Sequence, residues 1–104
     1  MRIFAAQVEA GGLLITEFEV VFTAKTMRLQ PGSRVPNFCR TQQPFSLADV
    51  EAGVLAVGLY RDIALATTPE QAVKTLCVRL ELHVQQAQKA LADAEARLRV
   101  ALVA

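Results

Sequence analysis

Apolar residues recur at alternating steps of four and three throughout the last third of the chain. The positions are Val73, Cys77, Leu80, Val84, Ala87, Leu91, Ala94, Leu98 and Ala101. This heptad is typical of a helix that packs along its length on another element. Thr68, Pro69 and Gln71 form the N-cap, first-turn and capping-box pattern of a helix start. Because no Pro or Gly follows Pro69, the pattern predicts one helix over residues 69–104.

A pattern typical of a strand also runs through the first half of this helix. Apolar residues alternate there with Cys77, Arg79, Glu81 and His83; they are Leu76, Val78, Leu80, Leu82 and Val84. The cap before this segment and the strong helix formers after it favour the helix. The alternation then predicts that the helix is apolar on several faces and buried as far as about Val84.

The length of this helix has a consequence for assembly. A helix of 35 residues is roughly 50 Å long, whereas a compact domain of this size is about 35 Å across. We therefore expect the helix to overhang, with its apolar stripe covered by a second copy in a homodimer. The candidate dimer interface, in parallel or antiparallel pairing, is Val84, Ala87, Leu91, Ala94, Leu98 and Ala101. The alternative is a break near Gln85 and Gln86, which would let the helix fold back.

The first thirty residues show the period of two that strands require. Phe4, Ala6 and Val8 alternate with Ile3, Ala5 and Gln7, and the Gly11-Gly12 pair that follows indicates a hairpin. A second strand is expected over 13–23, with one face in the core and the other mostly solvated. Its core face comprises Leu14, Phe18, Val20 and Phe22. A third strand is expected over 26–30, with Met27 and Leu29 inward.

The middle of the chain is less regular. Pro36 and Pro44 exclude a helix over 33–44, where a segment near 35–40 could form an edge strand. Ser46 and Asp49 predict a capped short helix over 47–52 that ends at Gly53. A further strand is expected over about 59–66. The predicted fold class is α+β: one domain over 1–104, with a small, mostly antiparallel sheet in 1–66 packed on the long helix of 68–104.

Composition sets broad limits on the kind of protein this is. The chain has 104 residues, of which 53% are hydrophobic and 20% charged, as expected of a globular domain. No apolar run reaches the ~20 residues of a membrane span, and no signal peptide pattern opens the chain. We therefore expect a cytoplasmic protein that does not bind membranes. Cys39 and Cys77 are expected to be free thiols, with a disulfide between them as the less favoured alternative.

One stretch of the chain has a biased charge. No acidic residue lies between Glu19 and Asp49, and the candidate partner-binding residues fall in this stretch: Lys25, Arg28, Arg34, Phe38 and Arg40. Such a segment could grip a nucleic-acid backbone or dock on an acidic protein surface. It could also be ordinary solvated surface. The net charge of +1 favours a protein partner, because a nucleic-acid binder is usually basic overall.

Candidate chemistry is sparse. His83, the single histidine, has no carboxylate or thiol three or four residues away, so a catalytic or metal role would need ligands from another element. Cys39 stands beside Arg40 but has no neighbouring base. We expect no enzyme activity, no metal and no cofactor.

Short segments of the chain resemble a family of phage proteins. They are Glu17-Phe18-Glu19-Val20, Thr23-Ala24-Lys25-Thr26 and Thr67-Thr68-Pro69-Glu70-Gln71-Ala72. Their order is similar to that in small uncharacterised accessory proteins encoded by bacteriophages and prophages. The resemblance implies a protein that binds and blocks a bacterial host protein or complex, for example a defence complex such as a CRISPR effector. The alternative is a nucleic-acid-binding accessory protein that uses the basic segment.

Overall fold

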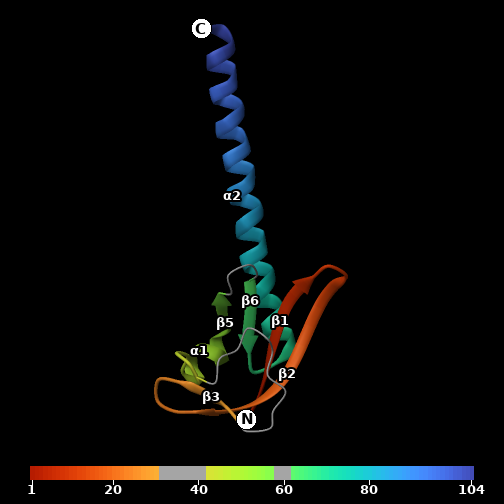
Figure 1. Cartoon of the computed structure of the whole chain (residues 1–104), viewed down its shortest axis with the longest axis vertical. Coiled ribbons are helices and arrows are strands. Elements are labelled where there is room, and N and C mark those ends of the chain that lie inside the picture. Colours follow the sequence, from red (N-terminus) through yellow and green to blue (C-terminus); the bar gives the residue numbers. More distant parts are fainter. Residues whose placement is uncertain (31–41, 58–61) are drawn as a thin grey trace.

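The computed structural model describes residues 1–30, 42–57 and 62–104. Within these ranges an antiparallel sheet of six strands curls into a half-barrel, and a long C-terminal helix rises from it (Figure 1). The strands lie in the order β4-β3-β2-β1-β6-β5. They are β1 Arg2–Glu9, β2 Gly12–Phe22, β3 Met27–Leu29, β4 Gln42–Gln43, β5 Val54–Val57 and β6 Asp62–Ala66, and the helices are α1 Leu47–Ala52 and α2 Pro69–Val103. The predicted α+β class is confirmed.

The predicted first hairpin is present, but its turn lies one residue earlier than the Gly11-Gly12 pair. β1 and β2 pair from Arg2 opposite Glu19 to Glu9 opposite Gly12, with the turn at Ala10 and Gly11. β6 pairs with the other edge of β1, Ala6 opposite Ala64. β1 therefore lies in the interior of the sheet, between β2, which follows it directly in the chain, and β6, which comes from residues 62–66.

The two faces of the central strands are buried by different elements. One face meets α1 and the curled strands in a core of Ile3, Ala5, Phe18, Val20, Met27, Val50, Ile63 and Leu65. The opposite face meets α2 in a smaller core of Ala6, Ala64, Ala66, Ala72 and Leu76. Small side chains dominate the second core, so the helix can approach the sheet closely. Neighbouring residues of β6 thus belong to different cores, as the period of two in a strand requires.

The short helix α1 begins as predicted. Ser46 Oγ accepts a hydrogen bond from the Asp49 backbone N–H at 3.2 Å, and Asp49 Oδ2 accepts one from the Ser46 N–H at 2.9 Å. This reciprocal pair is a complete capping box. It orients α1 so that Val50 enters the larger core.

The start of α2 differs from its prediction in one side chain. Thr68 Oγ1 accepts a hydrogen bond from the Gln71 backbone N–H at 3.2 Å, so the N-cap is confirmed. The expected capping box is not completed, because Gln71 Nε2 instead donates to the carbonyl oxygen of Ala52 at 3.2 Å. That carbonyl belongs to the last turn of α1, where helix geometry leaves oxygens without an internal partner. Gln71 therefore joins the two helices.

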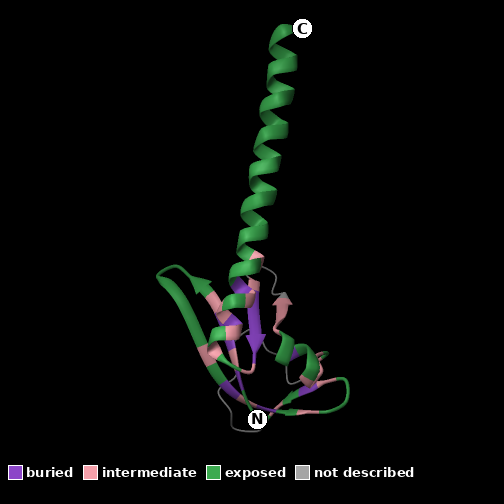
Figure 2. Ribbon diagram, turned by 180° about the vertical axis from the view of Figure 1, so that it is seen from behind, coloured by how far each residue is buried: buried purple, intermediate pink, exposed green. Residues whose placement is uncertain are grey.

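α2 is continuous over its whole length, so the alternative of a break near Gln85 and Gln86 is wrong. The radius of gyration is 18.0 Å and the longest extent is 64 Å, against about 13 Å expected for the radius of a compact domain of this length. The overhang is confirmed. The C-terminal half of α2 stands clear of the sheet, with all of it exposed (Figure 2).

Several finer predictions are wrong. Burial of α2 as far as Val84 is not found, because one side of the helix meets the sheet and only Ala72 and Leu76 are buried. The segment 54–66 holds two paired strands, β5 and β6, where one was expected. Leu14 was placed in the core but is exposed, since β2 runs past the end of the core there. The possible edge strand near 35–40 lies outside the described residues.

Gly53 provides a test of the packing between α1 and α2. Its φ is +86°, and a Cβ at this position would collide with the Thr75 side chain of α2. We expect Gly53→Ala to lower the free energy of unfolding by about 2–5 kcal/mol, because a left-handed residue with a Cβ costs about 1–2 kcal/mol and an overpacked contact about 1–3 kcal/mol.

Gly11→Ala is the matched control, because a Cβ at Gly11 meets nothing within 4 Å. Its effect should stay within about 0.5 kcal/mol. Urea denaturation of both variants measures the difference. If the two variants have equal free energies of unfolding, the Thr75 side chain of α2 does not lie close to Gly53.

Candidate interaction surfaces

A charged cluster marks the point at which α2 leaves the sheet. Asp62, at the start of β6, has 15% of its side chain exposed, with its Oδ2 3.0 Å from His83 Nε2 and its Oδ1 3.6 Å from Arg79 Nε. The Arg79 Nε atom is buried and makes no hydrogen bond, so the contact with Asp62 is electrostatic. Local patterns around His83 did not indicate this cluster, because Asp62 comes from another element. The cluster holds the helix against β6 at its last contact.

Beyond this cluster the helix runs free, and we call residues 84–103 the projecting segment. At 1.5 Å per residue it is about 30 Å long. Its apolar stripe, the seam, consists of the predicted interface residues Val84, Ala87, Leu91, Ala94, Leu98 and Ala101, all exposed. Leu91 is 60% and Leu98 58% exposed. In the isolated chain nothing among the described residues covers the seam.

The seam continues the side of the helix that packs on the sheet. Ala94 follows Leu76 by about five helical turns, and Leu91 follows Val73 by the same interval. Residues separated by whole turns point in the same direction. The seam therefore faces the space directly beyond the end of the protein's own sheet.

A second apolar surface lies at the end of the β1–β2 hairpin, and we call it the hairpin patch. It consists of Val8, Leu13 and Ile15, which are 51%, 52% and 41% exposed. Val8 pairs with Leu13, and Ile15 pairs with Ala6, which packs against α2. The patch is thus on the face of the sheet that α2 covers. Ile15 lies on the face of this strand that was expected to be mostly solvated, and the alternation of residues did not indicate an apolar patch there.

Two of the five candidate partner-binding residues can be located. Lys25 lies exposed in the turn between β2 and β3, and Arg28 is exposed on β3. Arg34, Phe38 and Arg40 lie outside the described residues, as does Cys39. The structure therefore leaves the basic segment as a prediction.

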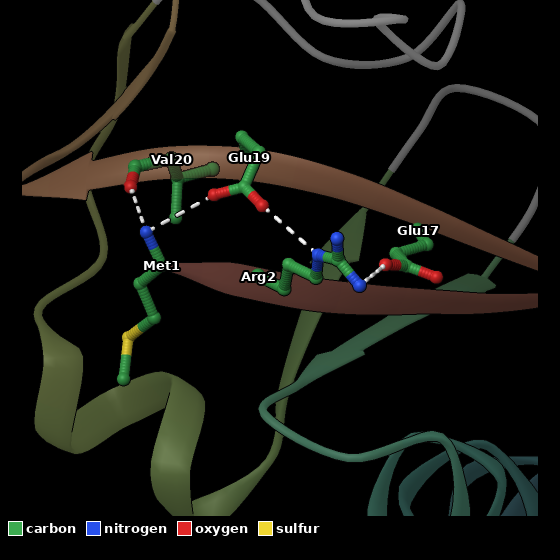
Figure 3. A network of polar contacts seen from close by, with 5 residues as sticks. All are labelled: Met1, Arg2, Glu17, Glu19 and Val20. Atoms are coloured by element: carbon green, nitrogen blue, oxygen red, sulfur yellow. Dashed lines mark hydrogen bonds and ion pairs between the residues drawn. The ribbon is translucent and has the colours of Figure 1, made fainter.

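A row of charges crosses the start of the β1–β2 hairpin (Figure 3). The amino group of Met1 donates a hydrogen bond to the Val20 carbonyl oxygen at 3.0 Å and lies 3.2 Å from Glu19 Oε2. Arg2 Nε donates to Glu19 Oε1 at 3.1 Å, and Arg2 Nη1 lies 3.0 Å from Glu17 Oε1. The hydrogen bond from Met1 is the main cause that lowers the pKa of Glu19; desolvation opposes it, and Arg2 adds to it.

Within 1–30, 42–57 and 62–104, no group of three or more His, Cys, Asp and Glu side chains could hold a metal ion. Cys77 is a free, exposed thiol on α2. In the same ranges no helix has the length and apolar character needed to cross a bilayer.

Comparison with known proteins adds no relative. The chain matches no protein-family model, no curated protein and no solved structure.

The charge row gives a test in acid. Because the pKa of Glu19 is lowered in the folded protein, its contribution to stability is present above the unfolded value of about 4.3 and is lost as the pH falls through the lower folded value. With an unblocked amino terminus, Glu19→Gln should therefore flatten the loss of stability below about pH 4.3.

Thermal unfolding at a series of pH values measures this effect. Glu51→Gln, on the exposed side of α1, is the control and should keep the acid response of the wild type. If Glu19→Gln and the wild type lose stability in parallel, Glu19 does not carry the expected linkage.

Proposed function

We propose that this protein is a non-enzymatic interaction module that self-associates through the projecting segment of α2. The single observation that supports this is the length of apolar, fully exposed helix that stands outside the sheet. About six turns of α2 make no contribution to the protein's own core. In proteins most of the stability of a helix comes from packing of its apolar side, and the projecting segment lacks such packing in the isolated chain.

The energetics favour coverage of the seam by another helix. Burying a Leu or Val side chain fully is worth about 1.5–3 kcal/mol, and Val84, Leu91 and Leu98 each have more than half of that area still exposed. The alanines at every seventh position, Ala87 and Ala94 among them, let a facing backbone approach closely. A homodimer is the simplest assembly that supplies such a helix.

The target of the assembled protein follows from the resemblance and not from geometry. The similar element order in phage and prophage accessory proteins supports a bacterial host protein or complex as the partner, for example a CRISPR effector. In this proposal the homodimer presents two sheets, and the exposed Lys25 and Arg28 form part of the surface that blocks the target.

Self-association is tested by mass measurement against concentration. We expect the wild type to pass from its monomer mass of 11.3 kDa to twice that mass as its concentration rises through the micromolar range typical of small interfaces. Ala94→Glu places a charge in the seam and should leave the protein monomeric. Sedimentation equilibrium measures both.

Ala96→Glu is the matched control, because Ala96 is on the other side of the same exposed turn. It should dimerise like the wild type. A wild type that stays at monomer mass throughout the range would refute self-association through α2.

The host target is tested by capture from a bacterial lysate with and without nuclease. The proposal expects a defined bacterial protein that is retained after nuclease treatment and lost with Lys25→Glu and Arg28→Glu together. The matched control is Lys89→Glu, an exposed cation on the projecting segment. Capture that depends on nucleic acid would instead favour the nucleic-acid-binding alternative for the basic segment.

A further inference from the structure

We propose that the occupant of the seam is a second copy of this chain in antiparallel orientation, and that the C-terminal end of each α2 covers the hairpin patch of the other copy. This inference rests on the proposed self-association and adds its geometry. Four features of the molecule support it: the position of the sheet, the side chains of the seam, the level of the hairpin patch and the size of the interface.

The position of the sheet excludes the parallel arrangement. The seam points in the same direction as Leu76, which packs on the sheet five turns earlier. In a parallel pair, the first halves of both helices would run side by side. Both sheets would then have to fill the same space between the helices, which are only about 8–10 Å apart. In an antiparallel pair the two sheets lie at opposite ends, and each helix enters the free space beyond the other copy's sheet.

The side chains of the seam fit antiparallel packing. The heptad alternates large residues at Val84, Leu91 and Leu98 with alanines three residues later. Antiparallel helices place the large position of one copy opposite the small position of the other, so Leu91 faces Ala94 of the second copy and Leu98 faces Ala87. Each layer then has the same volume, as close packing requires. Parallel helices would alternate layers of two leucines with layers of two alanines.

The hairpin patch lies at the level that the second helix reaches. Ala6 is opposite Ala64 in antiparallel pairing, so Asp62, two residues before Ala64 in β6, is level with Val8, two residues after Ala6 in β1. Asp62 contacts His83, which places Val8 and Leu13 beside the point where α2 leaves the sheet. In the register that pairs Leu91 with Ala94, the end of the second helix stops at this level. Leu102 of this second helix is 74% exposed. It points in the same direction as the seam residue Val84, because the two are five helical turns apart.

The size of the interface requires the hairpin contact as well as the helices. A helix about 30 Å long that packs with a third of its surface against a partner buries roughly 400 Å² of accessible surface. The helical pair alone stays below the ~1,200 Å² at which specific interfaces begin. Two additional contacts between a helix end and a hairpin patch bring the total close to that size. These contacts also cover the hairpin patch and the C-terminal end of α2, both of which are exposed in the isolated chain (Figure 2).

Disulfide trapping tests the orientation. In a background of Cys39→Ser and Cys77→Ser, one chain carries Ala87→Cys and a second chain, distinguished by a tag, carries Leu98→Cys. The antiparallel pair predicts a disulfide between the two different chains in the mixture, and none in either chain alone. Ala92→Cys on the outer side of the helix replaces Ala87→Cys in the control and should give no product.

The outcomes separate this inference from the proposed function. If either single-cysteine variant on its own forms a disulfide between two of its copies, the helices self-associate through the seam in parallel. This result would overturn only the antiparallel arrangement. A wild type that stays monomeric by mass would overturn both.

The hairpin contact is tested by a pair of neighbouring residues. Leu13 and Leu14 are both exposed but point to opposite faces of β2. Leu13→Ser should weaken dimerisation by at least about tenfold, because each dimer loses two apolar contacts, whereas Leu14→Ser should change it less than about twofold. Equal effects of the two substitutions would overturn the hairpin contact.

Discussion

The close contact between the first turns of α2 and the alanine-rich face of β1 and β6 determines the shape of the whole molecule. Ala6, Ala64 and Ala66 have small side chains that let the helix approach the sheet closely. Ala72 and Leu76 are therefore buried. Gly53 adds a second point of close approach, since a side chain there would meet Thr75. A rigid helix held at one end by such a contact has a fixed direction along its entire length.

The charged cluster at Asp62 extends this contact by about two more turns, from Leu76 to His83. Arg79 and His83 both reach the carboxylate, so the helix is held until it passes the edge of the sheet. After that the same side of the helix faces solvent with an unchanged apolar pattern. The fold thus positions an exposed apolar stripe directly beyond the end of its own sheet.

The larger core on the other face of the sheet has a different role. It is built from large side chains such as Ile3, Phe18 and Met27 and needs no part of α2. The sheet can therefore be stable while α2 contributes only its first turns. This division leaves the projecting segment available for assembly, because mutations in the seam remove nothing from either core.

Local patterns in the sequence determined the elements themselves. Thr68 and Pro69 fixed the start of α2, the absence of later Gly and Pro fixed its continuity, and Ser46 with Asp49 fixed α1. The overhang followed from length alone. In each case the information lies in neighbouring residues, because caps, turns and helix propensity act within a few positions of the chain.

The tertiary structure decided what the elements contact. Gln71 bonds to Ala52 and not to its own helix, Asp62 joins Arg79 and His83, and Val78 is exposed although its pattern suggested burial. The hairpin patch, too, depends on where α2 ends its contact with the sheet. These features arise between residues far apart in sequence, and such pairings are set by how the sheet curls and which face a helix covers, neither of which a local pattern encodes.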